Sequence, residues 1–397
     1  MSKNITLNAF YVPMWSDEIR DRMLELCKGA EIDLISNVLA EEVLNNNWRI
    51  EPHTFEFYKE TMARAAQYGL KLQTREIPLY TCLDMSDDDV REFAKKYRDL
   101  PGFGGFYVVD EPQDPTPYAR IENALRDICP DTKINVNFLP VNCYPSADAY
   151  YDLFCRFGNA LTHGGALSLD CYNFPGEGGV DEKNLFTNYN TLRRAGLDTG
   201  CDTAVYVQSV GMIGFFNYRR PSEADLRYNM MAALSYGVKE IKFFTFASPG
   251  NQDFPYTDAI VGPDHNPTDL YDIVCRINRK VHAIGTHLAA CDAKEVYHSK
   301  ITTEDVYEIL PGDSFVKVGD ADVIVSFMEE RAGDGKYVMV VNKDILASQT
   351  VTLTFEDTDT VCVVDDKTGE LVEKALDGGK LTLDMLAGDC ALIKLNK

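Results

Sequence analysis

The sequence has little positive charge and no long apolar run. Its 39 basic residues stand against 62 acidic ones, and the formal net charge of −23 would repel nucleic acids and anionic membrane surfaces. No stretch approaches the ~18 uninterrupted apolar residues that a membrane-spanning helix needs, and no apolar segment follows a basic head at the start. We therefore expect a cytoplasmic protein that binds neither nucleic acid nor membranes.

Patterns for metal sites and disulfides are missing as well. There is no CxxC pair and no HExxH motif, and the six histidines are dispersed, with no two at the spacing of metal ligands. The eleven cysteines are an odd number and are scattered through apolar stretches, which favours reduced thiols over a disulfide framework. We predict no metal site, and nothing in the sequence implies an organic cofactor.

Up to about residue 290, short apolar runs alternate with helical patterns. In the first unit, Ser16 opens a helix whose apolar residues recur at helical spacing. The expected strands are 7–14, 32–37, 70–78, 103–112, 132–140, 166–175, 202–211 and 241–249. Eight such repeats predict a (β/α)₈ TIM barrel. A doubly wound sheet is the alternative, disfavoured because no glycine-rich fingerprint follows the first strand.

The pattern changes near residue 294. From there, runs of alternating apolar and polar residues are separated by turn sequences such as "AGDGK" and "DGGK". We predict an α/β barrel over residues 1–293 followed by a C-terminal all-β sandwich over residues 294–397. The expected role of the second domain is to pack against the barrel, and a sugar-binding accessory role is the alternative.

Polar and aromatic residues gather at the ends of the expected strands. In a TIM barrel these ends form one rim, and active sites lie there. The rim residues are Tyr11, Met14, Asn37, Arg75, Glu76, Asp110, Glu111, Asn135, Asn137, Asp170, Tyr172, Tyr206, Gln208, Thr245 and Phe246. Carboxylates and amides bind hydroxyl groups, and aromatic rings stack on the C–H faces of sugars. The mixture predicts a neutral polyhydroxylated ligand, a small-molecule carbohydrate.

Two of these carboxylates suit glycosidic chemistry. Cleaving a glycosidic bond requires a proton donor and a second carboxylate across the ring, and Glu111 and Asp170 are the candidate catalytic pair. Neighbouring residues of a regular strand face opposite sides, so Asp110 is expected to support Glu111, and Pro112 favours an extended Glu111. "DEP" as a loop start without chemistry is the alternative for this motif. Asp170 as base, nucleophile or hydroxyl anchor stays open.

Six further rim residues are expected to position the substrate. They are Arg75, Asp110, Asn137, Tyr172, Tyr206 and Gln208. Arg75 would as readily hold a carboxylate in place as touch substrate, since a guanidinium matches both partners.

The motifs together resemble a group of bacterial glycoside-hydrolase-like proteins that are similar to family 42 β-galactosidases and other clan A enzymes. The segments "GFYVVDEP", "INVNFLP", "LSLDCYNFP", "AVYVQSVG" and "YRRPSEADLRYNMMAALSYGVKEIKFFTFASP" carry the resemblance, over about residues 100–250. It implies an acid/base Glu at the end of the fourth strand, which Glu111 matches, and a nucleophilic Glu at the end of the seventh. The chain has Gln208 there, and a neutral amide cannot attack an anomeric carbon. Asp170 would then be the partner of Glu111, or Glu223 would enter the site, although Ser222 resembles a helix N-cap.

The leading hypothesis is a glycoside hydrolase that cleaves small glycosides or oligosaccharides by paired-carboxylate acid/base chemistry. The alternative is a non-catalytic carbohydrate-binding protein on a barrel that lacks the usual nucleophile. A sugar isomerase or lyase would need a Lys or His base at the rim or a metal site, and the sequence indicates neither. The oligomeric state stays open, a homo-oligomer included.

Overall fold

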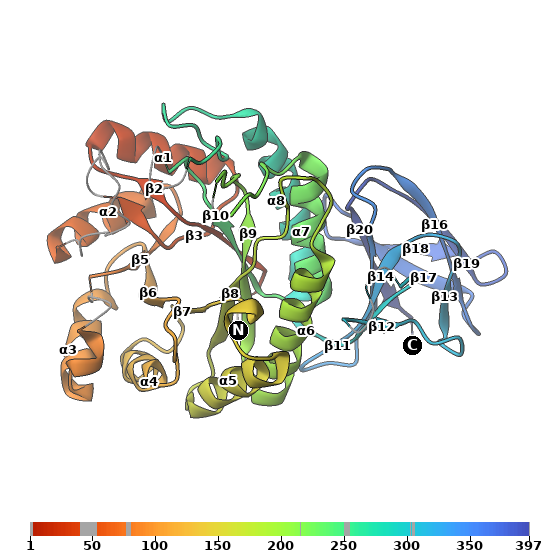
Figure 1. The fold of residues 1–397 in the computed structure, drawn as a ribbon, viewed down its shortest axis with the longest axis horizontal. Helices are drawn as coiled ribbons and strands as arrows, with labels where there is room; N and C mark the ends of the chain where they lie inside the picture. Colours follow the sequence, from red (N-terminus) through yellow and green to blue (C-terminus); the bar gives the residue numbers. More distant parts are fainter. Residues whose placement is uncertain are drawn as a thin grey trace.

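The first domain is a closed barrel of eight parallel strands, shown in Figure 1. The computed structural model describes residues 3–39, 54–76, 81–214, 216–249, 255–301, 303 and 306–396. In spatial order the barrel strands are β1 (Thr6–Ala9), β10 (Glu240–Phe244), β9 (Asp202–Gln208), β8 (Ala166–Asp170), β7 (Lys133–Phe138), β6 (Phe103–Asp110), β5 (Lys71–Thr74) and β3 (Leu34–Ile35). The predicted TIM barrel is confirmed, although the expected strands extended into the loops that follow them.

Helices follow the barrel strands along the chain. They are α1 (Asp17–Gly29), α2 (Phe55–Gln67), α3 (Asp87–Tyr97), α4 (Tyr118–Ile128), α5 (Ala147–Ala160), α6 (Glu182–Thr199), α7 (Glu223–Ser235) and α8 (Asp269–Leu288). Short 3₁₀ turns η1 (Cys82–Asp84) and η2 (Val141–Cys143) and the paired strands β2 (Val12–Pro13) and β4 (Val38–Leu39) complete this part. Ser16 caps α1, and Ser222 caps α7 in a capping box with Asp225. None of the described helices has both the length and the apolar character to cross a membrane.

The C-terminal domain is built from β-strands in two sheets. One sheet has the order β12 (Glu308–Ile309), β11 (Cys291–His298), β14 (Val323–Glu330), β15 (Lys336–Asn342), β20 (Cys390–Leu395), β17 (Thr360–Val364) and β18 (Leu371–Ala375). The other is β13 (Val316–Val318), β16 (Gln349–Phe355) and β19 (Lys380–Met385). Buried valines, leucines and Phe355 form a core of their own. The predicted boundary at 293/294 falls inside β11, and its place stays a prediction.

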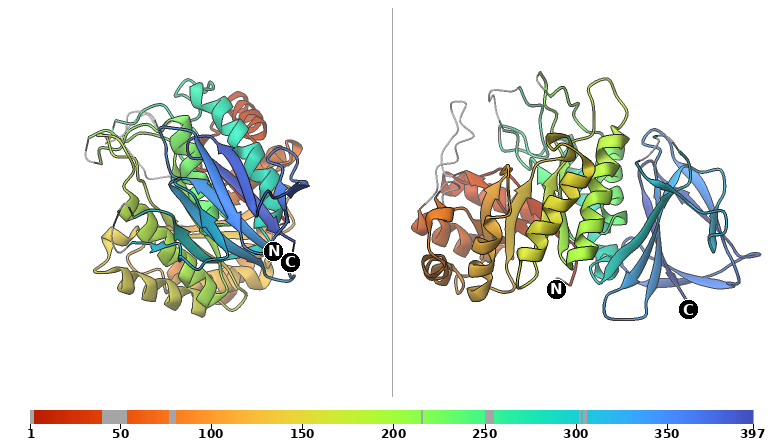
Figure 2. Two further views of the ribbon diagram at one scale, coloured as in Figure 1. Left: turned by 90° about the vertical axis from the view of Figure 1, so that its right-hand side faces the viewer. Right: turned by 60° about the horizontal axis from the view of Figure 1, so that its bottom comes forward.

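The β-domain lies beside the barrel helices α6, α7 and α8, as Figures 1 and 2 show. Ion pairs join the two parts: Arg331 of the β-domain lies 2.6 Å from Asp202 at the start of β9, and Lys280 of α8 lies 2.8 Å from Asp389. The contacts between the parts involve the outer helices and the start of β9, so the carboxyl ends of the barrel strands are left to the loops that follow them.

Candidate active site

The end of β6 is irregular, and this irregularity brings Asp110 and Glu111 to the same place. The pairing of β6 with β7 shifts register between Tyr107 and Val109, and Glu111 has a left-handed backbone with φ of 48°. The Glu111 N–H still donates to Asn137 O at 2.9 Å, which continues the ladder by one bond. The expectation of an extended Glu111 was wrong, because its backbone is left-handed. The expectation that the two carboxyls face opposite sides was also wrong, because side chains alternate only while a strand is regular.

One amide holds two of the carboxyl groups. Asn137 Nδ2 donates to Asp170 Oδ1 at 3.1 Å and lies 3.3 Å from Asp110 Oδ1. Glu111 and Asp170 are hydrogen-bonded to each other through their carboxyl groups. Asn137, near the end of β7, is therefore surrounded by three carboxyls. They belong to Asp110 at the end of β6, to Glu111 directly after it and to Asp170 at the end of β8. The structure brings these four predicted site residues together.

Glu111 and Asp170 retain protons more strongly than ordinary carboxyls do. Burial raises the pKa of Asp170 well above its usual range, and the charges of Glu111 and Asp110 raise it further. The pKa of Glu111 is raised as well, first by burial of its carboxyl and then by Asp110, while the hydrogen bond from Asp170 works the other way. Asp170 is buried, whereas Glu111 is exposed as a residue. Because burial disfavours the charged form of a carboxyl, Asp170 keeps the proton that the pair shares and donates it to Glu111.

A buried lysine beneath the cluster was missed by sequence reasoning. Lys242, in the middle of β10, donates to Ser168 Oγ at 2.9 Å and to Asn135 Oδ1. An ammonium group can only donate, so Ser168 uses its own proton toward Asn137 Oδ1, 2.9 Å away. The Asn137 amide is thereby oriented with its NH₂ toward the carboxyls. The signal for Lys242 was one basic residue in an otherwise apolar strand, "IKFFTF".

Aromatic side chains form a wall beside the carboxyls. Tyr172, two residues after Asp170, packs against Phe244 with ring centroids 5.0 Å apart, and Phe10 packs edge-on against Tyr206 at 5.3 Å. Phe10 also contacts Tyr107, over whose ring the Arg75 guanidinium lies at 4.5 Å. Two predicted residues, Tyr172 and Tyr206, thus line this wall. Arg75 lies at its far end on an aromatic face.

Gln208 ends β9, but its amide is taken up by the backbone. Its Oε1 accepts from Phe174 N at 3.3 Å, and its Nε2 donates to Val210 O at 3.1 Å and to Arg219 O at 2.8 Å. The side chain is fully buried. Gln208 therefore joins the loops that follow β8 and β9, and its predicted contact with substrate stays a prediction.

Glu223 lies apart from this cluster. It is the first residue of α7, where its carboxylate pairs with Arg227 at 3.0 Å and with Arg276 at 3.2 Å. These two arginines, on the outer helices α7 and α8, compensate the negative charge of Glu223. The suggestion that Glu223 supplies the second catalytic carboxylate is therefore not supported by its position.

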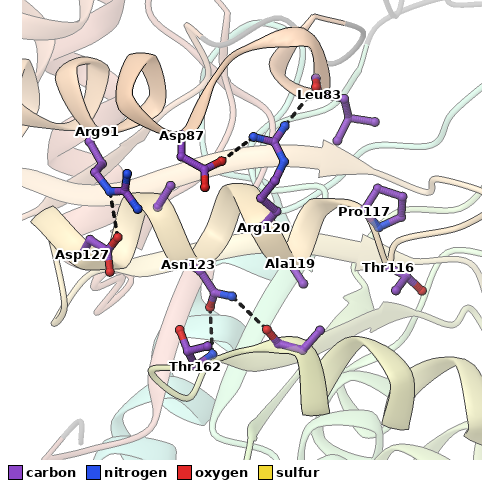
Figure 3. Close-up of a pocket in the computed structure, with 12 residues that line it drawn as sticks. Leu83, Asp87, Arg91, Thr116, Pro117, Ala119, Arg120, Asn123, Asp127 and Thr162 are labelled. Carbon is purple, nitrogen blue, oxygen red and sulfur yellow. Dashed lines mark hydrogen bonds and ion pairs between the residues drawn. The ribbon is translucent and has the colours of Figure 1, made fainter.

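Two cavities lie away from the rim. One, of about 600 Å³, lies between η1, α3, α4 and the end of α5, and Figure 3 shows that its charged side chains pair with one another. Arg120 bonds Asp87, and Arg91 bonds Asp127. The other, of about 660 Å³, lies at the amino-terminal ends of the strands, the face of a TIM barrel that contributes stability rather than catalysis. In the part of the chain that the structure describes, no three His, Cys, Asp or Glu side chains are grouped as metal ligands.

No protein-family model and no curated protein matches the sequence, whereas solved structures match the fold. A catalytic mutant of Gan42B, a GH42 β-galactosidase from G. stearothermophilus, aligns with a TM-score of 0.62 and 10% identity over 99% of this chain and 98% of that one. The β-galactosidase of the Antarctic haloarchaeon Halorubrum lacusprofundi aligns with a TM-score of 0.51 and 14% identity. That match covers 70% of this chain and 58% of the haloarchaeal chain.

A β-galactosidase from Marinomonas ef1 aligns with a TM-score of 0.50 and 11% identity over 72% of this chain and 60% of that one. The chain thus spans nearly all of the Gan42B structure and less than two thirds of the other two. At such identities the likeness concerns the fold alone. The resemblance inferred from the motifs is confirmed at that level: the chain has the glycosidase-like fold of family 42 β-galactosidases and other clan A enzymes.

Proposed function

We propose that this protein is a glycoside hydrolase that cleaves O-glycosidic bonds of small glycosides or oligosaccharides with Glu111 and Asp170. The observation that carries the proposal is the gathering of these two carboxyls around Asn137 at the end of the barrel strands, where Asn137 bonds the Asp170 carboxyl and the Glu111 backbone. Acid/base chemistry on a glycosidic bond needs one protonated and one ionised carboxyl, and a pair that shares one proton supplies both states. The aromatic wall beside the pair suits the apolar faces of a sugar ring.

The two carboxyls have different proposed roles because they differ in exposure to solvent. Glu111 is exposed and follows the end of β6, so it meets the glycosidic oxygen. It takes up the shared proton from Asp170 and delivers it to the leaving group. Asp170, buried and held by Asn137, is left ionised. It stabilises the positive charge that develops on the sugar and takes a proton from the water that attacks the anomeric carbon. The carbon–oxygen bond to the leaving group breaks as the bond to the water oxygen forms. The proton given to the leaving group is replaced by the one that Asp170 takes from water.

Substrate has to separate the pair for this reaction. Hydrogen-bonded carboxyls lie closer than the ~5–5.5 Å of retaining enzymes and the ~6.5–9.5 Å of inverting ones. Asp170 is fixed by its strand and by Asn137, whereas Glu111 lies just beyond the strand end. We therefore expect Glu111 to move away from Asp170 when a sugar enters.

A second candidate function is carbohydrate binding without cleavage. The observation in its favour is Gln208, which stands where the resemblance implies a nucleophile and whose amide is occupied by three backbone partners. A neutral side chain in this state neither attacks a sugar nor activates water.

Hydrolysis of a panel of 4-nitrophenyl α- and β-glycosides of galactose, glucose, xylose, arabinose and fucose tests the proposal. Glu111→Gln should lose most of the rate on substrates with poor leaving groups and less on nitrophenyl glycosides, because an acid catalyst matters most where the leaving group needs a proton. Glu177→Gln, which changes an exposed carboxylate after β8, is the matched control and should keep the wild-type rate. If the wild type cleaves nothing in the panel while sugars raise its melting temperature, the binding function is correct.

A further inference from the structure

The aromatic wall continues outward from the rim to an exposed ring. From Tyr172, a contact with ring centroids 6.4 Å apart leads to Tyr218. Tyr218 in turn stacks on Phe216, with centroids 6.2 Å apart and an angle of 12° between the planes. Exposure grows along this path, from the buried Phe10 to the half-buried Tyr172 and Tyr218 and to Phe216, which is 46% exposed.

The segment that carries the outer rings is fastened on both sides. Met212 and Tyr218 exchange backbone hydrogen bonds of 2.9 and 2.8 Å, and we call the described residues 212–214 and 216–218 the hairpin. The Gly176 N–H donates to Asn217 O at 2.8 Å, and the Ile213 N–H donates to Pro255 O at 3.0 Å. These bonds hold the hairpin against the loops after β8 and β10, so the exposed ring is presented on a tethered backbone.

Gln208 contributes to the same arrangement. Its Nε2 donates to the carbonyl of Arg219, directly after the hairpin, and its Oε1 accepts from Phe174 N, two residues after Tyr172. One buried amide therefore links the base of the hairpin to the loop that carries Tyr172. The residue at the end of the seventh strand holds the two aromatic segments in register.

We propose that Phe216 and Tyr218 form an outer subsite that binds the part of an oligosaccharide beyond the ring held at Tyr172. The inference rests on the proposed carbohydrate function and adds a substrate class to it, namely chains of two or more sugar units. Parallel, partly exposed aromatic faces are suited to the C–H faces of pyranose rings. The ring path leads from them to Tyr172, two residues from the Asp170 carboxyl, so one chain would contact both.

The charge of the protein agrees with this occupant. The formal net charge is −23, which disfavours an anionic ligand and leaves a neutral saccharide as the suitable one. A second copy of this chain covering Ile213 and Phe216 is the competing occupant, and the experiment separates the two.

Saturation-transfer NMR and calorimetry with wild type, Phe216→Ala, Phe216→Trp and Ile213→Ala test the subsite. The probes are galactose and β-1,4-galactotriose, glucose and cellotriose, and xylose and xylotriose. Phe216→Ala should weaken binding of the preferred trisaccharide about 3- to 10-fold, the usual effect of one lost aromatic contact, and leave its monosaccharide unchanged. Phe216→Trp should keep trisaccharide binding. Ile213→Ala is the matched control, because Ile213 is 52% exposed on the same hairpin and lies outside the ring path.

The outcomes separate the subsite from the proposed hydrolysis. Trisaccharide binding that depends on Phe216, in a protein that cleaves none of these sugars, supports the subsite and overturns the hydrolase. Equal affinities of wild type and Phe216→Ala for every chain length overturn the subsite, whether or not the protein hydrolyses glycosides. The absence of binding by any probe also overturns it. Sedimentation velocity gives the remaining outcome: if Phe216→Ala and Ile213→Ala both reduce the association state, this surface is an interface between copies.

Discussion

Asn137 Nδ2 lies 3.1 Å from Asp170 Oδ1, across two neighbouring strands of the barrel. This bond directs the Asp170 carboxyl toward Glu111, and it exists because Ser168 and Lys242 orient the amide from below. The hydrogen-bonding capacity of each group sets the direction of these bonds. The Lys242 ammonium donates to the Ser168 hydroxyl, which donates to the Asn137 carbonyl oxygen, so the Asn137 NH₂ faces the carboxyls. The proposed catalytic pair therefore depends on a chain of buried side chains, Asn137, Ser168 and Lys242.

Replacing Asp170 by Asn should stabilise the protein at neutral pH more than at acid pH. The folded-state pKa of Asp170 is raised, so the stability that it contributes is fully present at pH values near or below the unfolded pKa and is lost as the pH rises toward the folded pKa. An Asn side chain keeps an acceptor for Asn137 and a donor for Glu111 without that loss. We expect a gain of about 1–3 kcal/mol in the free energy of unfolding at pH 8 and little at pH 4.

Urea denaturation at both pH values measures this difference. Asp131→Asn, which changes an exposed carboxylate before β7, is the control and should show no such pH dependence. A gain for Asp170→Asn that is the same at pH 4 and pH 8 would contradict the raised pKa.

The contribution of Lys242 to the free energy of unfolding should increase as the pH rises above 8. Burial lowers the pKa of Lys242 from its usual 10.5 to about 8, so between these values the unfolded chain binds a proton that the folded protein has released. The free energy of unfolding of wild type relative to Lys242→Met should therefore increase by about 2–4 kcal/mol between pH 8 and pH 10.5. Other titrating groups are common to both proteins and cancel in the difference.

The same variant tests the chain of hydrogen bonds. Lys242→Met and Ser168→Ala break it at neighbouring points, so their effects on the free energy of unfolding at pH 7 should not add in a double-mutant cycle. Additive effects would show that the two residues act independently.

Changing Gln208 to Glu should destabilise the protein rather than supply a nucleophile. A carboxylate cannot donate to the carbonyls of Val210 and Arg219, which Nε2 contacts now, and it would bury a charge beside them. We expect a loss of about 2–4 kcal/mol, measured by thermal and urea denaturation. Gln208→Met, of similar size and without charge, should lose less. Full stability of Gln208→Glu together with a gain in glycosidase activity would refute this prediction.

Arg331 should hold the β-domain to the barrel. It lies 2.6 Å from Asp202 in the barrel and 2.6 Å from Asp292 in β11, and all three side chains are largely shielded from solvent. Arg331→Met leaves two carboxylates facing each other, so we expect a loss of about 1–3 kcal/mol that shrinks when Asp202 is replaced by Asn as well. Calorimetric unfolding of the single and double variants checks the coupling.

The amino-acid sequence by itself determined the order of the barrel elements and which residues lie near the ends of the strands. Apolar runs, helical spacing and caps such as Ser16 and Ser222 depend on neighbouring residues, so they can be interpreted without knowing the fold. With eight repeats, they predict a barrel and therefore one rim shared by Glu111, Asn137 and Asp170.

Only the tertiary structure decided how these residues meet. The register shift in β6 and the left-handed Glu111 turn both carboxyls to one side, which strand alternation would have forbidden. Lys242 on β10 reaches Ser168 on β8 and Asn135 on β7 across the closed barrel, and Ser168 in turn donates to Asn137. Gln208 links the loops that follow β8 and β9. These relations depend on the pairing of strands far apart in the chain and on burial of charge, and neither is encoded in any local pattern of residues.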